Sequence, residues 1–310
     1  MLLQSKDVLG LQYMSAEEIE YIIESAGTMK ELLLQSAKKM PHLQGKSIVT
    51  LFYENSTRTR LSFELAGKYL GATVSSLGVS TSSVQKGETL LDTGKTIEAM
   101  GTDIIIIRHP LAGAPKFLAD NFSGSVLNAG DGMHEHPTQA LLDMFTMKEH
   151  FGGFRGLKVT IIGDIQHSRV ARSNIWGLQK LGAEVTLCGM NTMMPFAIEE
   201  TGAKVTSSLE EAITDADVIM ALRIQRERQK GGLLPSAREY HSFFGINDDV
   251  LKMCRKDAFI MHPGPVNRGV ELSSSVMDAD FSVIDDQVTN GVAVRMALLY
   301  ILTRRDKDEA

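Results

Sequence analysis

Short apolar runs alternate with segments of helical periodicity along nearly the whole chain. Continuous runs such as Ile104–Ile107 are typical of strands that are buried on both faces, which is the pattern of parallel sheets. Strand–helix alternation in both halves predicts an α/β fold with two doubly wound parallel-sheet domains. The predicted strands are Ser47–Tyr53, Ala72–Leu77, Asp103–Arg108 and Ser125–Ala129 in the first half, and Lys158–Gly163, Glu184–Cys188, Ala216–Leu222 and Ala258–His262 in the second.

Two helices bracket the predicted domains. Ser15-Ala-Glu-Glu18 is a capping box that begins an amphipathic helix reaching to about Ala37. Near the end, Gly291–Arg304 has apolar residues at helical spacing and basic residues in its last turn. We expect these terminal helices to pack together on the first domain.

The domain boundary is expected near the middle of the chain. Pro137–His150 has the pattern of a helix, and Phe151-Gly-Gly-Phe154 has that of a joint. The expected first domain covers residues 1–135 together with a C-terminal helix at 288–310. Residues 136–149 form an inter-domain helix, and residues 150–287 form the second domain.

Composition and charge exclude several classes of protein. The chain has 310 residues, 43% hydrophobic and 23% charged, which suits two globular domains. A net charge of −6 argues against a general nucleic-acid binder. Neither a signal peptide nor the ~20-residue apolar run of a membrane span is found. The two cysteines lack CxxC spacing, so neither a disulfide nor a metal site is expected, and a cytoplasmic location fits best.

Polar and cationic residues follow the predicted strands of the first half, where ligands of open α/β sheets bind. Ser56, Thr57, Arg58 and Thr59 open a helical run after the first strand, and a helix N-terminus suits a phosphate. On residue types alone, Ser56 could instead cap the helix while the arginine is solvated. The glycines and the lysine of a Walker loop are missing there.

Three further segments of the first half carry candidate ligands. The loop Ser80–Lys86 (STSSVQK) places Lys86 among hydroxyl groups, although a surface loop is an equally simple interpretation. Arg108 emerges from the four-isoleucine strand. His136 and Gln139 follow the fourth strand, and the spacing of His134 and His136 before a proline favours loop donors over metal ligands.

In the second half, Gly163–Arg169 follows a strand and precedes a helix, but the GxGxxG fingerprint of a nicotinamide-dinucleotide site is absent. Arg223-Ile-Gln225 ends another strand and offers a cation and an amide. His262-Pro-Gly-Pro265 ends the last strand, and its two prolines stiffen a turn that can present backbone carbonyls.

Together these segments resemble the aspartate/ornithine carbamoyltransferase family, through nearly the whole chain and in the same order. STRTR marks the family in general, whereas HPTQ, RIQ and HPGPVNRG are similar to its aspartate branch. The segments that carry the resemblance are Ser56–Arg60, Gln85–Thr89, Arg108–Pro110, His136–Gln139, Gly163-Asp164 with Arg169, Arg223–Gln225 and His262–Pro265.

The resemblance implies a carbamoyl-phosphate domain, an aspartate domain and an active site between them. It implies carbamoyl transfer to the amino group of L-aspartate in pyrimidine biosynthesis, without a cofactor or metal. The implied carbamoyl-phosphate ligands are Ser56, Thr57, Arg58, Thr59, Ser82, Lys86, Arg108, His136, Gln139, Gly264 and Pro265. The implied aspartate ligands are Lys86, Arg169, Arg223 and Gln225.

The resemblance also implies an assembly. Ser82 and Lys86 would reach into the site of a neighbouring subunit of a homotrimer, and some members of the family have a regulatory chain or a partner enzyme of the pathway. No nucleic acid or membrane partner is implied. Two positions depart from other members: Gln85 stands where some have a second lysine, and Gly264 where others have leucine or alanine.

The expected chemistry is acyl transfer without a covalent enzyme intermediate. The neutral amine attacks the carbonyl carbon, phosphate leaves, and the catalytic candidates are Thr59, Arg108, His136 and Lys86. The first three would meet the negative charge that grows on the carbonyl oxygen. No GxSxG nucleophile elbow is present, and the amine proton is expected to pass to a phosphate oxygen.

Three alternatives stay open from sequence. An ornithine or other amino-acid carbamoyltransferase would need a carboxylate for the side-chain ammonium, and Asp164 and Glu227 lie near the relevant segments. A non-catalytic binding module of the same fold is the second alternative. A nicotinamide-dependent dehydrogenase is the third, and the missing glycine fingerprint disfavours it.

Overall fold

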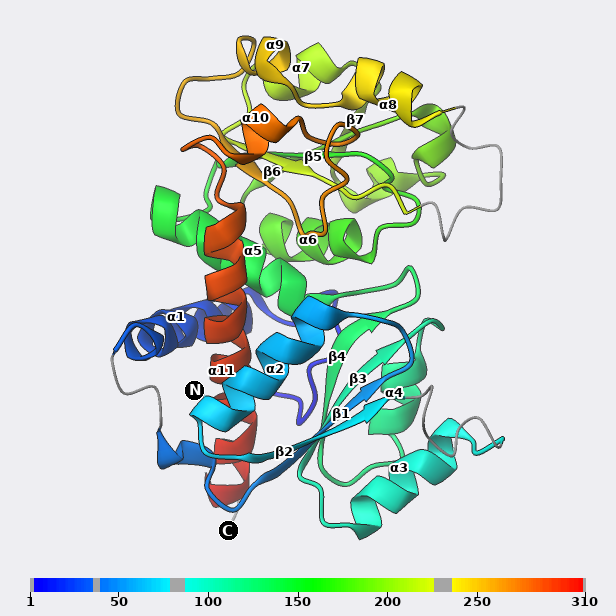
Figure 1. Cartoon of the computed structure of the whole chain (residues 1–310), viewed down its shortest axis with the longest axis vertical. Helices are drawn as coiled ribbons and strands as arrows, with labels where there is room; N and C mark the ends of the chain where they lie inside the picture. Colours follow the sequence, from blue (N-terminus) through cyan, green and yellow to red (C-terminus); the bar gives the residue numbers. More distant parts are fainter. Residues whose placement is uncertain (1–2, 36–39, 79–86, 226–235, 309–310) are drawn as a thin grey trace. The chain divides into compact units, whose positions relative to one another are not determined.

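The computed structural model describes residues 3–35, 40–78, 87–225 and 236–308. The chain forms two compact units: residues 1–145 with 289–310, and residues 146–288. Each unit is built on one parallel sheet, which confirms the predicted fold class (Figure 1). Within the described residues, no helix combines the length and the apolar character needed to cross a bilayer.

The sheet of the first unit has the strand order β2-β1-β3-β4. Its strands are β1 (Ser47–Phe52), β2 (Thr73–Gly78), β3 (Ile104–His109) and β4 (Ser125–Asp131). The helices that begin in this unit are α1 (Ala16–Leu33), α2 (Thr57–Tyr69), α3 (Leu90–Ala99), α4 (Ala114–Ala119) and α5 (Pro137–Phe151). A 3-10 turn, η1 (Pro41–Leu43), precedes β1.

Both faces of this sheet are covered, which explains its continuous apolar strands. Ile105 and Ile107 face a cluster that includes Ile97 of α3 and Leu118 of α4. On the other face, α2 approaches β1 so closely that a Cβ added at Gly67 would lie 3.3 Å from Cδ1 of Ile48. Successive residues of a strand point to opposite faces, so each face of the sheet receives its own apolar set.

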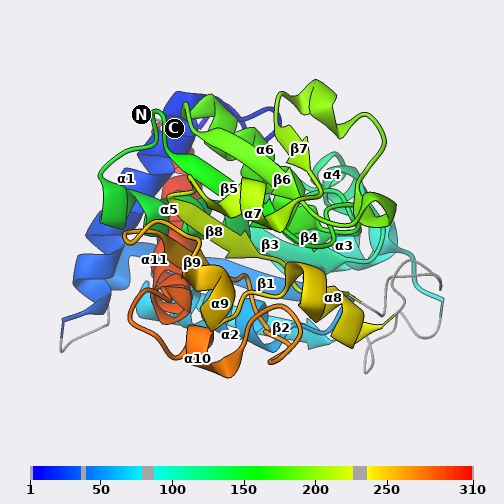
Figure 2. The ribbon, with the colours of Figure 1, turned by 90° about the horizontal axis from the view of Figure 1, so that it is seen from above.

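The second unit has the strand order β7-β6-β5-β8-β9. Its strands are β5 (Lys158–Ile162), β6 (Glu184–Cys188), β7 (Lys204–Thr206), β8 (Val218–Ala221) and β9 (Phe259–Met261). Its helices are α6 (Arg169–Lys180), α7 (Leu209–Ile213), α8 (Ala237–Phe244), α9 (Asp248–Leu251) and α10 (Ser274–Met277), with 3-10 turns η4 (Asn191–Met193) and η5 (Ile198–Thr201). Figure 2 shows this sheet from above, with α6 and α7 labelled beside it.

The terminal helices differ from their predicted lengths. The capping box at Ser15 and Glu18 is present, but α1 ends at Leu33, about one turn earlier than predicted. The last helix, α11 (Ile284–Asp308), begins four residues before the predicted bound at 288 and seven residues before the apolar pattern that starts at Gly291. In both views α1 lies beside α11 (Figures 1 and 2).

Candidate active site

The first candidate half-site lies where the strand order of the first sheet reverses. From β1 the chain passes through α2 to β2 on one side, whereas β3 and β4 lie on the other side. Phe52 pairs with Arg108 at the carboxyl ends of β1 and β3, and the backbone N–H of Tyr53 donates to the carbonyl of Arg108 at 2.8 Å. The N-terminus of α2 and Arg108 therefore emerge at one edge of the sheet, the usual position of a ligand in this architecture.

The first turn of α2 carries four of the predicted phosphate ligands. Ser56 is the N-cap residue, and its side chain makes no capping hydrogen bond within the described part of the chain. The hydroxyl of Ser56 therefore does not cap the helix. Thr57 and Arg58 are exposed and Thr59 is buried, so hydroxyl groups and a guanidinium lie at the N-terminus of the helix, where anions bind favourably.

Arg108 is held at the sheet edge by two oxygen partners. Its Nε lies 3.2 Å from Oε2 of Glu54, and its Nη1 donates to the carbonyl of Ala129 at 3.4 Å. Glu54 directly follows β1, so this ion pair joins the ends of the two strands. A half-buried guanidinium in this position is suited to an oxyanion.

The loop after β4 is organised around the buried carboxylate of Asp131. Asp131 accepts hydrogen bonds from the backbone N–H groups of Gly113 and Glu135 at 2.8 and 3.1 Å, and from Nδ2 of Asn128 at 2.9 Å. His134 Nδ1 lies 3.1 Å from Asp131 Oδ2. Burial raises the pKa of the Asp131 carboxyl, but these hydrogen bonds outweigh burial and leave its pKa below the ordinary value. His134 thus has a structural carboxylate partner.

This loop leads directly into α5 and fixes two predicted ligands. Glu135 is buried and accepts the backbone N–H of Leu11 at 2.7 Å. The next residue, His136, is also buried and precedes Pro137, the first residue of α5. Gln139 lies in the first turn of the same helix. The structure therefore brings His136 and Gln139 together at the start of one helix in the first unit.

The second candidate half-site lies at the corresponding point of the second sheet. The order reverses between β5 and β8, where the backbone N–H of Leu222 donates to the carbonyl of Ile162 at 2.8 Å. Arg169 is the first residue of α6, after the N-cap Ser168, and it is only 2% exposed. Arg223 lies two residues beyond the end of β8 and is half-buried. Arg169 and Arg223 therefore emerge from neighbouring strand–helix connections.

A carboxylate that the sequence did not single out organises this region. Glu271 is 1% exposed and accepts the backbone N–H of Ile224 at 2.8 Å. It also accepts the backbone N–H and Nδ2 of Asn267, each at 2.7 Å. Ile224 lies between the predicted ligands Arg223 and Gln225. One buried carboxylate thus ties the segment after β8 to the loop after β9.

The loop after β9 presents the predicted backbone contact. Nδ1 of His262 accepts the backbone N–H of Gly264 at 2.8 Å, and the backbone N–H of His262 donates to Oε1 of Gln287 at 3.0 Å. Gly264 has a φ of 62°, a left-handed conformation that glycine adopts without strain. The peptide bond from Gly264 to Pro265 is cis.

Some predictions fall elsewhere. Ser82, Lys86 and the departure at Gln85 lie outside the described residues.

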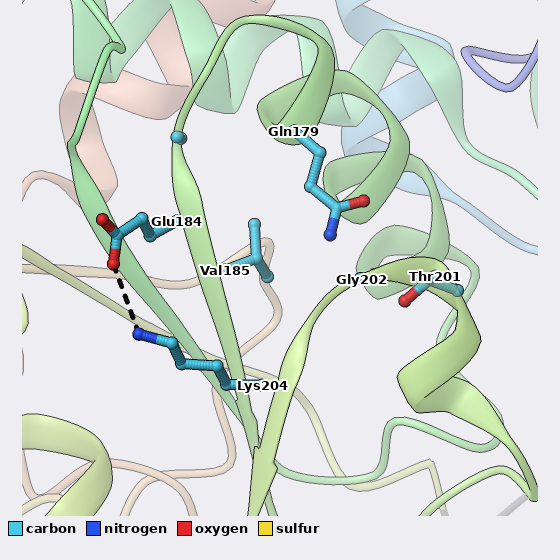
Figure 3. A pocket seen from close by; sticks show the side chains of 7 residues that line it. Gln179, Glu184, Val185, Thr201, Gly202 and Lys204 are labelled. Carbon is cyan, nitrogen blue, oxygen red and sulfur yellow. Dashed lines mark hydrogen bonds and ion pairs between the residues drawn. The ribbon is translucent and has the colours of Figure 1, made fainter.

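A shallow surface groove of the second unit, shown in Figure 3, contains none of the predicted ligands. It lies beside β6 and β7, whose Glu184 and Lys204 form an ion pair at 3.4 Å. Its lining residues are Gln179, Ala183, Glu184, Val185, Thr201, Gly202 and Lys204.

Each parallel sheet thus carries an anion-suited region at its switch point, and comparison with known proteins gives the family. Residues 6–149 match the model of the aspartate/ornithine carbamoyltransferase carbamoyl-P binding domain, and residues 155–302 match that of the Asp/Orn binding domain. The chain belongs to the aspartate/ornithine carbamoyltransferase family. The dehydrogenase alternative is therefore wrong.

Relatives give a finer comparison. The aspartate carbamoyltransferase catalytic subunit of Acetivibrio thermocellus is 65% identical over 310 residues, covering 100% of this chain and 99% of that protein. The subunit of the same name from Ruminiclostridium cellulolyticum is 67% identical over 305 residues, covering 98% and 97% of the two chains.

Solved structures agree on the fold. Aspartate transcarbamoylase from Trypanosoma cruzi, in complex with carbamoyl aspartate and phosphate, has a TM-score of 0.87 at 30% identity and covers 96% of each chain. Ornithine carbamoyltransferase from Thermus thermophilus has a TM-score of 0.85 at 25% identity, covering 96% of this chain and 99% of that one. The fold is thus common to both branches, whereas the high-identity relatives belong to the aspartate branch.

Proposed function

We propose that this chain transfers the carbamoyl group of carbamoyl phosphate to the amino group of L-aspartate, which gives N-carbamoyl-L-aspartate and phosphate. The observation that carries the proposal is that the chain is 65% identical to an aspartate carbamoyltransferase catalytic subunit, and each of its two sheets carries arginines near its switch point. The T. cruzi structures with carbamoyl aspartate and with N-(phosphonacetyl)-L-aspartic acid support the same substrate pair.

Carbamoyl phosphate binds to the first unit. The N-terminus of α2 provides backbone N–H groups and the hydroxyls of Ser56, Thr57 and Thr59, while Arg58 and Arg108 provide charge-assisted hydrogen bonds to the phosphate. Because the leaving phosphate gains negative charge during the reaction, cations fixed beside it lower the barrier.

The carbonyl group of carbamoyl phosphate needs donors for its oxygen and acceptors for its nitrogen. Thr59, Arg108 and His136 stabilise the oxygen as negative charge grows on it. Gln139 and the backbone of the Gly264–Pro265 turn bind the nitrogen. No enzyme nucleophile takes part: the aspartate amine attacks the carbonyl carbon, the C–O bond to phosphate breaks, and the amine proton passes to a phosphate oxygen.

L-Aspartate binds to the second unit through its two carboxylates. Arg169 and Arg223 provide the cations, and Gln225 provides an amide. The guanidinium of Arg169 sits at the start of α6, where the helix end adds partial positive charge. Glu271 keeps the backbone of Ile224 in place and thereby sets the directions of its two neighbours.

Assembly, pathway and location belong to the same proposal. The chain works as a homotrimer in which Ser82 and Lys86 complete the site of a neighbouring subunit, in an early step of pyrimidine biosynthesis in the cytoplasm. Lys86 takes part in both catalysis and aspartate binding. The name "catalytic subunit" of the relatives supports association with a further, regulatory chain.

A steady-state assay with aspartate and ornithine as competing acceptors tests the activity. We expect the kcat/KM for carbamoylation of aspartate to be at least ~100-fold above that for ornithine. The reason is that the two arginines of the site, Arg169 and Arg223, repel the ammonium group of ornithine. Native mass measurement tests the trimer. Turnover of ornithine alone would show the other branch, and binding of both substrates without turnover would show a non-catalytic module.

A further inference from the structure

In the first unit, Gln139 is hydrogen-bonded to a buried carboxylate on the same helix, that of Asp143. Gln139 and Asp143 are one turn apart on α5, and Nε2 of Gln139 donates to Oδ1 of Asp143 at 2.9 Å. Gln–Asp pairs at this spacing lie on the same face of a helix. Asp143 is 0% exposed, so its carboxylate is an interior hydrogen-bond acceptor.

This bond determines which way the Gln139 amide faces. An ionised carboxylate only accepts hydrogen bonds, so it must face the NH₂ group of the amide. The Oε1 atom of Gln139 is then turned away from Asp143 and remains an acceptor for a ligand. A carbamoyl group differs from an acetyl group in carrying an NH₂ group, which needs such an acceptor.

Arg295 of α11 supplies the charge that a buried carboxylate requires. Arg295 is 4% exposed, and its guanidinium lies 5.0 Å from the centre of the Phe63 ring on α2. Burial lowers the pKa of Arg295 to about 10, while the negative charge of Asp143 acts in the opposite direction. Arg295 therefore stays protonated at neutral pH, so the interior of this unit holds a positive charge that interacts with the negative charge of Asp143.

The packing around Arg295 leaves space for this arrangement. A Cβ added at Gly291, one turn earlier on α11, would lie 2.6 Å from Nη1 of Arg295 and 3.2 Å from Cδ2 of Leu142. Arg295 thus packs against the Phe63 ring of α2, and the absence of a side chain at Gly291 leaves room for its guanidinium.

We infer that Asp143 is a positioning residue that fixes the amide of Gln139 so that its oxygen accepts a hydrogen bond from the carbamoyl NH₂. The inference rests on the proposed function, because it assigns Gln139 to carbamoyl phosphate. It makes Asp143 a determinant of the preference for a carbamoyl over an acetyl group.

The variant Asp143→Asn reverses the orientation of the Gln139 amide without changing the shape of the side chain at position 143. An Asn amide can turn its NH₂ group toward Gln139, which an ionised carboxylate cannot do. The Gln139 amide then flips and presents its own NH₂ group to the carbamoyl NH₂. Two donors face each other, so binding of carbamoyl phosphate weakens.

The experiment compares the KM of carbamoyl phosphate with the inhibition constant of acetyl phosphate, which has a methyl group in place of the NH₂ group. In Asp143→Asn we expect the KM to rise about tenfold and the inhibition constant to change less than about twofold. Gln139→Met should show the same loss of selectivity, and the double variant no further loss. Glu149→Gln, an exposed carboxylate on the same helix, is the matched control.

Equal weakening of both ligands in Asp143→Asn would mean a structural role and would overturn the inference, as would unchanged selectivity in Gln139→Met. If Asp143→Asn does not fold, hydrogen exchange of the Gln139 side-chain amide in the unmodified protein tests the inference instead. We expect exchange at least ~100-fold slower than in a free glutamine side chain, because the bond to Asp143 is buried. Exchange at the free rate would refute the positioning bond. Absence of turnover in the unmodified protein would instead defeat the proposed function.

Discussion

Glu54 and Arg108 form an ion pair across the carboxyl ends of β1 and β3, with Nε of Arg108 3.2 Å from Oε2 of Glu54. Their side chains are 15% and 21% exposed for Arg108 and Glu54, respectively, so the pair is partly shielded from water. An arginine held in this way is already placed for an anion. Glu54 and Arg108 therefore connect the fold of the first unit to its proposed phosphate site.

Replacing Arg108 or Arg58 with alanine should lower kcat/KM for carbamoyl phosphate by about 100- to 1000-fold, which is typical for loss of one fixed donor to developing charge. The midpoint of thermal unfolding should change by only a few degrees, because neither side chain is fully buried. Arg60→Ala is the matched control, since Arg60 is exposed on the same helix and pairs with Glu64 at 3.7 Å. Activity within a few-fold of the unmodified protein would contradict the roles of Arg58 and Arg108.

Glu271→Gln should raise the KM of aspartate about tenfold while leaving the KM of carbamoyl phosphate within about threefold. A glutamine keeps only one acceptor oxygen for the N–H groups of Ile224 and Asn267, so the segment that carries Arg223 and Gln225 loosens. The measurement is a pair of saturation curves for the two substrates. Equal change in both constants, or no change, would argue against the positioning of this segment by Glu271.

The stability of the protein should depend on pH through Asp131. Its pKa in the folded state lies below the ordinary value, so the carboxylate contributes stability that is fully present above about pH 4 and is lost as the pH falls through the folded-state pKa. Asp131→Asn should lower the free energy of unfolding by about 2–3 kcal/mol at pH 7, and this difference should narrow below pH 4.

Urea unfolding at pH 7, 4.5 and 3.5 measures this difference. Asp215→Asn is the control, because the Asp215 side chain is 80% exposed and lies 3.7 Å from Lys158 at the surface. A destabilisation by Asp131→Asn that is the same at all three pH values would show that charge plays no part.

Both cysteines should react slowly with a thiol reagent in the folded protein. Burial raises the pKa of Cys188 to about 12, with a smaller effect from the charge of Glu211, and raises that of Cys254 to about 11. Because the thiolate is the nucleophile, reaction with a chromogenic aromatic disulfide at pH 8 should be at least ~100-fold slower than in guanidinium. Complete modification of the native protein within seconds would contradict this expectation.

The order of elements could be predicted from the sequence, because apolar periodicity reports which faces of a strand or helix are buried. Eight strands were placed within one or two residues of their ends. The short strand β7 (Lys204–Thr206) was missed, because three residues do not establish a period. The start of α11 was misplaced, because Asn290 and Gly291 are typical of a helix end when their burial in the packed helix is unknown.

The candidate ligands could be read from the sequence because they lie at or just beyond the carboxyl ends of strands, and parallel strands bring these ends to one edge. Arg108 and Arg223 are examples of such local signals. The residues that hold these ligands gave no comparable signal. Asp143, Arg295 and Glu271 lie inside helices or loops, and their partners are known only once the chain has folded.

The sequence by itself determined the two α/β domains and the family, and it predicted the residues offered to two anionic substrates, because each of these depends on local pattern and order. Only the tertiary structure decided that Glu271 ties together Ile224 and Asn267, and that Asp143 faces Gln139. The physical reason is that a buried charge must find its partners in space, and those partners lie as far as 47 positions away along the chain, from Glu271 to Ile224.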